Sequence, residues 1–362
     1  MKYVDEFRNI KLARKLALKI EEIMPRGNIN IMEVCGSHTQ SFYRFGIDKL
    51  LPKGLRLISG PGCPVCVSPQ EYIDAAIELA NNRNNIILSF GDMLRVPGSK
   101  STLEKARAGG ANISMAYSAF ETIKVAKKNP QKKVVFLAVG FETTAPTIAL
   151  SILQAKKEKI NNLFFLSSLK LIPPAMQHLL NDPELKIDAF LCPGHVSSII
   201  GAKAYEFIPK KYSLGCCVTG FEPVDILEGL YFLLRQIVRK KPKAENQYIR
   251  AVTRNGNLKA QKIIKQVFAI ADTNWRGLGV IPKSGLKIRD EFSKFDAERN
   301  FRIRHMTHDT RHMTQCRCAD VIKGLIRPKE CKLFRKACTP ENPYGPCMVS
   351  QEGACNAYYK YL

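Results

Sequence analysis

Residues 133–146 read KVVFLAVGFETTAP, an apolar run that ends in a glycine-bearing turn. Segments of this kind alternate with helical patterns through roughly residue 235, which is typical of parallel α/β units. The predicted strands are residues 30–34, 55–59, 85–90, 133–139, 163–166 and 189–191. Open α/β sheets bind ligands beyond the carboxyl ends of their strands, so we expect the chemistry in the turns SGPGCPVC, FGDM, GFETTAP and CPGHV that follow them.

Two of these turns have counterparts elsewhere in the chain. The PGC of residues 61–63 resembles the PGH of residues 193–195, and the GFE of residues 140–142 resembles that of residues 220–222. We therefore predict an α/β protein with two related parallel-sheet domains, residues 29–130 and 131–240. A third, cysteine-rich domain is predicted at residues 241–362, rich in loops and helices and joined by the N-terminal helix of residues 1–28. Within it we expect a helix at 258–271 and a loop at 275–286.

The composition predicts a soluble, strongly basic protein. No apolar run in the 362 residues approaches the ~18 residues of a membrane span, and the N-terminal sequence MKYVDEFRNIKLARK is charged where a signal peptide would be apolar. We therefore expect a cytoplasmic location without membrane contact, where cysteines serve as ligands or redox thiols rather than structural disulfides. The net charge is +24. Because no recognition motif accompanies it, this charge favours an acidic protein partner over nucleic acid.

The CPVC segment of residues 63–66 follows a GPG turn and precedes a predicted helix, with SPQE at residues 68–71 as its expected capping box. The positive end of a helix favours thiolate over thiol at Cys63 and Cys66. This arrangement suits reversible oxidation. Half of a zinc site and a chance pair are the alternatives.

Cys35 and His38 also follow a predicted strand, in the segment MEVCGSH of residues 32–38. A neutral imidazole can orient a ligand, accept a proton or bind a metal. A single cysteine and histidine are by default packing residues, so this segment alone leaves packing and function equally open. The similar placement of the CPVC turn favours function.

The C-terminal 47 residues contain half of the twelve cysteines, namely Cys316, Cys318, Cys331, Cys338, Cys347 and Cys355. Four thiolates can hold either a tetrahedral zinc ion or a cubane iron-sulfur cluster. The spacing leaves both open, although the paired CxxC knuckles of zinc ribbons are missing. Nearby, His305, His308 and His312 have arginine neighbours, so we expect a basic surface helix or an inter-domain contact there rather than a zinc site.

These segments together resemble the HypD family of hydrogenase maturation proteins. The resemblance rests on MEVCGSHTQ (32–40), SGPGCPVCVSP (59–69), GFETTAP (140–146), CPGHVS (192–197), TGFEP (219–223), WRGLG (275–279), FDAE (295–298) and the tail from CRCADVIKG to GACNAYYKY. It implies a scaffold for the iron centre of nickel-iron hydrogenases, in which iron carries carbon monoxide and two cyanides. It also implies a HypC-type chaperone and a HypE-type cyanide donor as partners, with the hydrogenase large subunit reached indirectly.

The same resemblance implies a role for individual residues. Cys35, with His38 beside it, would hold the iron, and Cys63 and Cys66 would be a redox pair. The ligands of a [4Fe-4S] cluster would be Cys318, Cys331, Cys338 and Cys355. Residues at strand ends predicted to support the site without a primary role are Glu142, Thr143, His195 and Glu222. We therefore expect a redox-capable scaffold rather than a conventional turnover enzyme.

Other functions remain open at this point. A stand-alone, iron-sulfur-dependent thiol-disulfide oxidoreductase would need Cys63 and Cys66 but would give Cys35 no role. A basic zinc protein that binds nucleic acid is supported by charge alone. The sequence contains no Walker A loop, no GxGxxG after a strand and no GxSxG elbow, so it does not indicate the enzymes that those motifs define.

Overall fold

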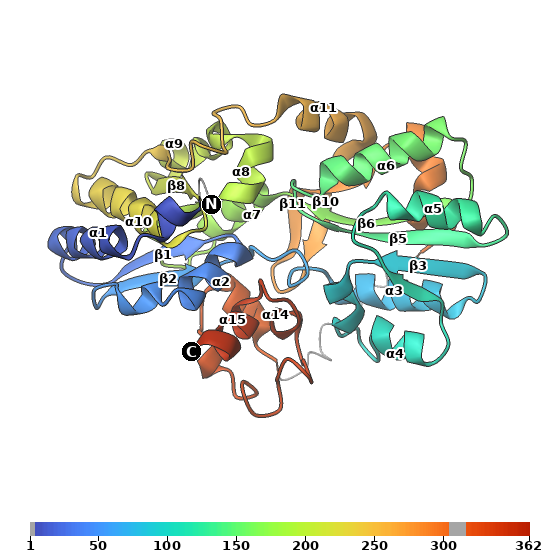
Figure 1. The fold of residues 1–362 in the computed structure, drawn as a ribbon, viewed down its shortest axis with the longest axis horizontal. Coiled ribbons are helices and arrows are strands. Elements are labelled where there is room, and N and C mark those ends of the chain that lie inside the picture. Colours follow the sequence, from blue (N-terminus) through green and yellow to red (C-terminus); the bar gives the residue numbers. More distant parts are fainter. Residues whose placement is uncertain (1–3, 304–315) are drawn as a thin grey trace.

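Two β-sheets lie side by side, and the C-terminal segment packs below the junction between them (Figure 1). The structure is a computed structural model that describes residues 4–303 and 316–362. His305, His308 and His312 lie outside the described residues, so the expectation for them stays a prediction. Within the described ranges, no helix combines the length and the apolar character needed to cross a membrane.

The first sheet has five parallel strands in the order β2-β1-β7-β8-β9. They are β1 (Ile29–Glu33), β2 (Leu55–Ser59), β7 (Ala189–Pro193), β8 (Gly215–Thr219) and β9 (Ala244–Asn246). The second sheet has the order β10-β11-β6-β5-β3-β4, in which β3 to β6 pair in parallel and the hairpin β10–β11 is antiparallel. Its strands are β3 (Asn85–Ser89), β4 (Ile113–Met115), β5 (Lys133–Gly140), β6 (Leu163–Lys170), β10 (Phe268–Trp275) and β11 (Gly279–Ile288).

Helices connect the strands and cover the sheets (Figure 1). The helices that precede β9 in the sequence are α1 (Ile10–Ile23), α2 (Gly36–Arg44), α3 (Gln70–Asn81), α4 (Leu103–Ala108), α5 (Glu121–Lys128), α6 (Ala145–Lys157), α7 (Ile172–Leu180), α8 (Gly194–Ile200), α9 (Phe207–Tyr212) and α10 (Pro223–Val238). After it come α11 (Leu258–Val267), α12 (Ala297–Asn300), α13 (Cys318–Lys323), α14 (Pro346–Val349) and α15 (Ala354–Tyr361). The N-terminal helix α1 packs against α10.

The predicted α/β class is confirmed, and each predicted strand coincides with an observed one to within a few residues. The two sheets nevertheless divide the chain differently from the predicted boundary at residue 130. The first sheet combines residues 29–59 with residues 189–246, and the second combines residues 85–115, 133–170 and 268–288. Each sheet therefore takes strands from both sides of residue 130.

The predictions for residues 258–271 and 275–286 are wrong in part. The helix α11 ends at Val267, and residues 268–288 form the antiparallel hairpin β10–β11. The turn of this hairpin contains Gly277 and Gly279, whose φ angles of +83° and +76° favour glycine. The hairpin extends the second sheet because β11 pairs with β6 at Gly285 and Leu286.

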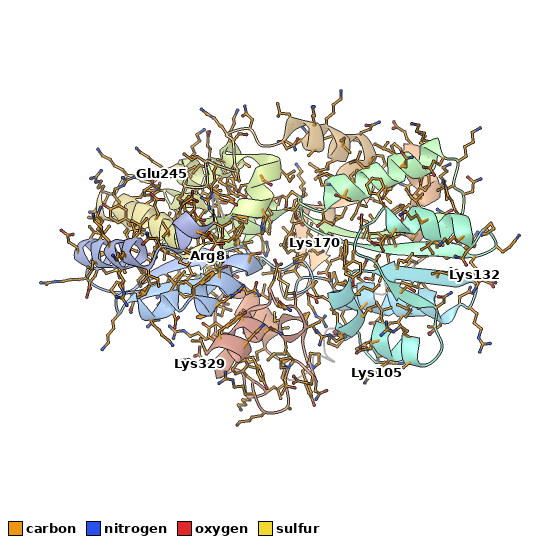
Figure 2. The ribbon with its side chains drawn as sticks, viewed as in Figure 1. Arg8, Lys105, Lys132, Lys170, Glu245 and Lys329 are labelled. Atoms are coloured by element: carbon orange, nitrogen blue, oxygen red, sulfur yellow. A yellow bond between two sulfur atoms is a disulfide. The ribbon has the colours of Figure 1, made fainter. Side chains whose placement is uncertain are left out.

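A buried lysine anchors this hairpin to β6. Lys170 is fully buried and donates a hydrogen bond from Nζ to the carbonyl oxygen of Asn274 at 2.6 Å. Its ammonium group also lies 5.4 Å from the ring centroid of Trp275, and burial lowers the pKa of Lys170 to about 7. Figure 2 shows Lys170 in the interior, whereas Lys105 and Lys329 lie at the periphery.

The topology of the first sheet positions the candidate site. Its strands β2, β1, β7 and β8 are parallel neighbours, so their carboxyl ends lie along one edge. The residues that follow these strands therefore converge, although they come from both ends of the chain. On one face of the sheet, α10 contributes fully buried leucines, including Leu227, Leu230 and Leu234. Burying a leucine side chain contributes about 1.5–3 kcal/mol, so this helix holds the sheet firmly.

Replacing Gly229 in α10 with alanine should destabilise the protein. A Cβ atom there would lie 2.1 Å from Cγ2 of Thr219 and 3.1 Å from Cδ1 of Leu191. Alanine gains about 1 kcal/mol of helix propensity, but overpacking a core costs about 1–3 kcal/mol, so we expect a net loss of up to about 2 kcal/mol in the free energy of unfolding. Urea denaturation measures it. The control is Gly109→Ala, where the added atom meets nothing closer than 3.4 Å; equal losses in both variants would contradict the argument.

Candidate thiol and metal site

Cys35 lies between the end of β1 and the start of α2. Its carbonyl oxygen accepts the first hydrogen bonds of the helix, from the backbone N–H groups of His38 at 2.8 Å and Thr39 at 3.3 Å. Its own N–H donates to Oε2 of Glu33 at 2.9 Å, and the other oxygen of that carboxyl group accepts a hydrogen bond from the Thr39 hydroxyl. Burial, followed by the charges of Glu352 and Glu33, raises the pKa of the Cys35 thiol. The thiol is therefore held in its protonated form when no cation is bound.

His38, three residues further on, is fully buried and neutral. Its Nε2 lies 2.9 Å from the carbonyl oxygen of Gly220 and 3.0 Å from Oγ1 of Thr219. A carbonyl can only accept, so Nε2 carries the proton and Nδ1 keeps its lone pair. Burial lowers the pKa of His38 to about 4, and Nδ1 has no hydrogen-bond partner. An imidazole held this way can offer Nδ1 to a metal ion or a proton.

The turn that carries Cys63 and Cys66, here called the dithiol turn, lies directly against Cys35. Cys63 and Cys66 form a disulfide with a Cα–Cα distance of 5.2 Å. The preceding Gly62 accepts a hydrogen bond from the backbone N–H of Gly36 at 3.0 Å. A Cβ atom on Gly62 would lie 2.2 Å from the backbone nitrogen of Cys35, so only glycine allows this approach. The glycines of the GPG turn thus bring the two upstream thiol groups together.

The predicted capping box at residues 68–71 is wrong. The helix α3 begins at Gln70 with Pro69 as its N-cap, and the Ser68 hydroxyl donates to the carbonyl oxygen of Pro64 at 2.9 Å. Ser68 therefore closes the CPVC turn instead of capping the helix. The helix that follows still starts four residues after Cys66.

The C-terminal segment contacts both upstream features. The Cys66 Sγ lies 3.8 Å from the carbonyl oxygen of Pro346, and Cys347 lines the same small cavity as Cys63 and Cys66. On the other side, the Ser37 hydroxyl donates to Oε1 of Glu352 at 2.7 Å. The sequence alone indicates no role for Cys347 or Glu352, because nothing in the cysteine spacing shows where the tail passes.

The structure brings the predicted tail ligands together with the two remaining tail cysteines. Burial, and then the charges of four other tail cysteines, raise the pKa of Cys355; these are Cys318, Cys316, Cys338 and Cys331. The backbone of Gly345 passes so close that a Cβ atom would lie 2.6 Å from Sγ of Cys316 and 3.1 Å from that of Cys318. Cys316 and Cys347 are neighbours of Cys318 that shift the pKa of its thiol, which is raised overall.

This group of thiols fits a bound cluster better than a single ion. Among residues 4–303 and 316–362, no three His, Cys, Asp or Glu side chains are spaced to hold one metal ion. A cubane cluster takes each thiolate at a different iron, so its ligands lie further apart. When these buried thiols are ionised, their negative charges repel one another. A cationic iron-sulfur core bound among them would offset this repulsion.

The four residues predicted to support the site lie in different places. Oε1 of the buried Glu142 accepts the backbone N–H of Ile172 at 3.0 Å, and burial raises the pKa of Glu142 to about 7. Thr143 lines a cavity of about 600 Å³ beside the CPVC turn, together with Pro64 and Val65.

His195 and Glu222 both lie at the carboxyl edge of the first sheet. The ring of His195 stacks on Phe221 at a centroid distance of 4.0 Å, and His38 lies 4.7 Å from the same Phe221 ring. Glu222 caps α10 and forms an ion pair with Arg8 at 2.5 Å. His195 is thus next to the Cys35 region, and Glu222 has an evident structural role.

Comparison with known proteins identifies the family of the chain. The family model described as "Hydrogenase formation hypA family" (HypD) matches residues 11–362. The hydrogenase maturation factors HypD of Azotobacter vinelandii and Cupriavidus necator are 46% and 44% identical to the chain, and each alignment covers 100% of this chain and 97% of the relative. The Escherichia coli K12 hydrogenase maturation factor HypD is 42% identical over 100% of this chain and 98% of its own.

The matched family model and these relatives make the chain, with its α/β fold and its cysteine-rich C-terminal segment, a member of the class of hydrogenase maturation factors. Within that class, the chain belongs to the HypD family, because the family model and the relatives span nearly its whole length. The resemblance stated from the sequence motifs is therefore confirmed.

Replacing Glu142 with glutamine should remove a pH dependence of stability. The folded-state pKa of about 7 lies above the ordinary value of 4.5, so the folded protein keeps this proton where the unfolded chain has lost it. Stability from this group is complete below about pH 4.5 and is lost as the pH rises to about 7, by on the order of 3 kcal/mol. Between pH 5 and pH 8, Glu142→Gln should gain stability relative to the parent in urea denaturation.

The exposed Glu78 on α3 provides the matched control. The effect of Glu78→Gln on the free energy of unfolding should be the same at both pH values. If Glu142→Gln behaved in the same way, the carboxyl group of Glu142 would not be protonated in the folded protein.

Proposed function

We propose that this protein is the scaffold on which the iron centre of nickel-iron hydrogenases receives its cyanide and carbon monoxide ligands. One observation carries the proposal: the turn with the Cys63–Cys66 pair contacts the Cys35 segment through Gly62 and Gly36 and shares a small cavity with Cys347 of the tail, although these residues lie up to about 310 residues apart in the sequence. A protein that only reduces disulfides would have no use for Cys35 and His38 beside the dithiol. A maturation scaffold needs both groups.

Cys35 and His38 would hold the iron that is being assembled. Iron binding at Cys35 requires loss of the thiol proton, which the cation itself would drive, and the buried, unpaired Nδ1 of His38 on the same helical turn is a neutral nitrogen that could serve as a second ligand. A thiolate is a suitable anchor for ferrous iron that carries cyanide and carbon monoxide, because these ligands favour soft, low-spin iron. The iron here is cargo, passed on through a HypC-type chaperone.

The tail cysteines would hold a [4Fe-4S] cluster, which supplies electrons one at a time. Three ligands would be Cys331, Cys338 and Cys355, and Cys318 is the fourth by its spacing. Cys316 competes with Cys318 for that position, because it is a neighbour of Cys318 and its charge acts on Cys355 as well. Opening the Cys63–Cys66 disulfide takes two electrons and two protons and yields two thiols. Cys347 lines the same small cavity as the disulfide and is also a neighbour of Cys318.

The partners follow from the same proposal. A HypC-type chaperone would share the iron at Cys35, a HypE-type protein would donate cyanide, and the hydrogenase large subunit would be reached indirectly. This work would take place in the cytoplasm. The net charge of +24 suits acidic protein surfaces.

Replacing Cys35 with alanine should abolish hydrogenase maturation in cells that depend on this protein. The infrared bands of carbon monoxide and cyanide should disappear from the purified complex, while the cluster absorbance stays. Cys217→Ala is the matched control, because Cys217 is also buried but lies within β8, away from the turn residues. Maturation that survives Cys35→Ala but fails in Cys63→Ala would favour the thiol-disulfide oxidoreductase.

Protein purified without oxygen should be brown and contain about four irons and four sulfides per chain beyond any cargo iron. Serine at Cys331, Cys338 or Cys355 should remove the colour and most of this iron. Cys316→Ser and Cys318→Ser, compared side by side, identify the fourth ligand as the one whose variant loses the iron. A colourless protein that contains zinc would contradict the cluster assignment.

A further inference from the structure

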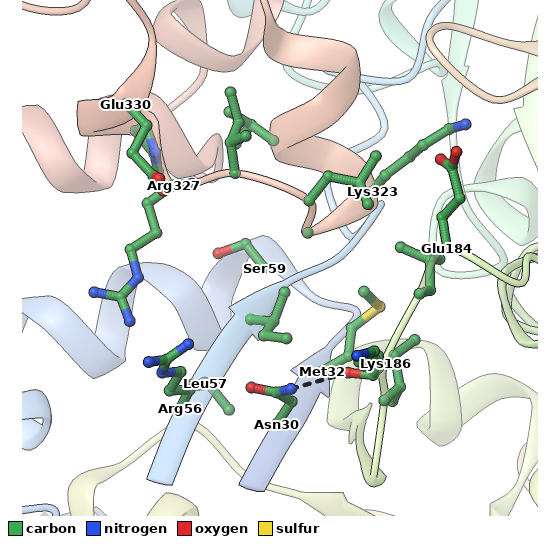
Figure 3. A pocket seen from close by; sticks show the side chains of 18 of the residues that line it. Asn30, Met32, Arg56, Leu57, Ser59, Glu184, Lys186, Lys323, Arg327 and Glu330 are labelled. Carbon is green, nitrogen blue, oxygen red and sulfur yellow. Dashed lines mark hydrogen bonds between the residues drawn. The ribbon is translucent and has the colours of Figure 1, made fainter. Parts of the chain in front are cut away.

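A cavity of about 320 Å³ lies between the first sheet and the C-terminal segment, apart from the thiols (Figure 3). Its floor is the face of β1 and β2 that carries Asn30 and Arg56, which are partners in the register of these strands. Its roof is the loop of residues 323–328, which follows α13. The volume falls in the range of small-molecule sites, which begins at about 300 Å³.

Two arginines from opposite walls converge in this cavity. Arg327 extends from the C-terminal segment toward Arg56 on β2 (Figure 3). In the part of the chain that the structure describes, neither guanidinium group has an ion-pair partner. Both side chains are exposed, so water screens their mutual repulsion, and both guanidinium groups are available to an anion that enters the cavity.

The remaining charges at the cavity do not neutralise this pair. The cavity is lined by four cationic side chains and two carboxylates. The cations are Arg56, Lys186, Lys323 and Arg327, and the carboxylates are Glu184 and Glu330. Glu330 is engaged, since its Oε2 accepts the backbone N–H of Arg327 at 2.7 Å. Lys323 lies 3.7 Å from Asp182, outside the cavity lining. With Asp182 counted against Lys323, four cations face three carboxylates, and the remaining positive charge favours an anion.

The geometry of the donors selects the class of anion. Guanidinium groups bind phosphate oxygens through paired N–H donors, and two of them on opposite sides can grip one phosphate. The apolar part of the wall, formed by Met32, Ile58 and Ile326, leaves room for an uncharged body attached to it. The Asn30 amide donates to the carbonyl oxygen of Lys186 at 3.1 Å and fixes the edge of the cavity.

We propose that this cavity binds a phosphate group, free or as part of a small phosphate ester, between Arg56 and Arg327. The bound anion would connect the first sheet to the loop between Cys318 and Cys331. That loop already presses on the sheet, because a Cβ atom on Gly324 would lie 2.2 Å from Cγ2 of Ile58. Binding of the anion would therefore tighten the docking of the cysteine-bearing segment against the sheet. The proposed phosphate site does not depend on the iron chemistry proposed above.

Isothermal titration calorimetry on the full chain, purified without oxygen, tests this inference with two probes, inorganic phosphate and adenosine monophosphate. Each titration is matched by sodium chloride at the same ionic strength. We expect saturable binding at one site and a higher melting temperature with the probe that binds. Arg56→Gln and Arg327→Gln should each raise Kd at least about tenfold, as expected for the loss of a charge-assisted pair of hydrogen bonds. Tighter binding of inorganic phosphate indicates the free ion, and tighter binding of the nucleotide indicates an ester.

Lys329→Gln is the matched control, because Lys329 is exposed on the same loop and does not line the cavity. It should bind phosphate as the parent does. Arg56→Lys keeps the charge but removes the paired donors, so it should fold normally and bind more weakly. The proposal is overturned if neither probe saturates, if sodium chloride reproduces the effect, or if binding survives in both glutamine variants.

Discussion

The backbone hydrogen bond from Gly36 to Gly62 joins the start of α2 to the dithiol turn, and the rest of the site depends on how closely these two segments approach. Neither position has room for a side chain, since a Cβ atom on Gly62 would meet Cys35 and one on Gly36 would lie 2.2 Å from the carbonyl oxygen of Glu352. The C-terminal segment is therefore the third member of the contact. A change in how the tail docks must alter the surroundings of Cys35.

Burial governs the electrostatics of this region more than any ion pair does. It raises the pKa of Glu33 and of Glu142 to about 7, and it is the largest cause of the raised pKa of Glu352. A raised pKa lowers the ionised fraction of each carboxyl group, and burial thereby limits the negative charge of Glu33 and Glu352 that acts on the Cys35 thiol.

Local patterns in the sequence were sufficient for the fold class and for most strand positions, because apolar runs that end in glycine turns mark buried parallel strands. Local patterns also located the turns after β1 and β2 that carry Cys35, His38 and the CPVC pair. The pairing of β1 with β7 was beyond them, because two strands 160 residues apart meet through the packing of the whole chain. The hairpin at residues 268–288 was mistaken for a helix and a loop, since glycine, proline and polar residues interrupt its alternation. The position of Cys347 follows from the path of the tail over α2, which no local pattern encodes.

The Cys63–Cys66 disulfide is almost completely enclosed, with only 4% and 2% of the two residues exposed. Thiol exchange requires the attacking sulfur to reach the disulfide along the S–S axis. Glutathione and similar small thiols cannot do so without local opening of the turn. An external thiol would therefore reach this disulfide only when the turn around it opens.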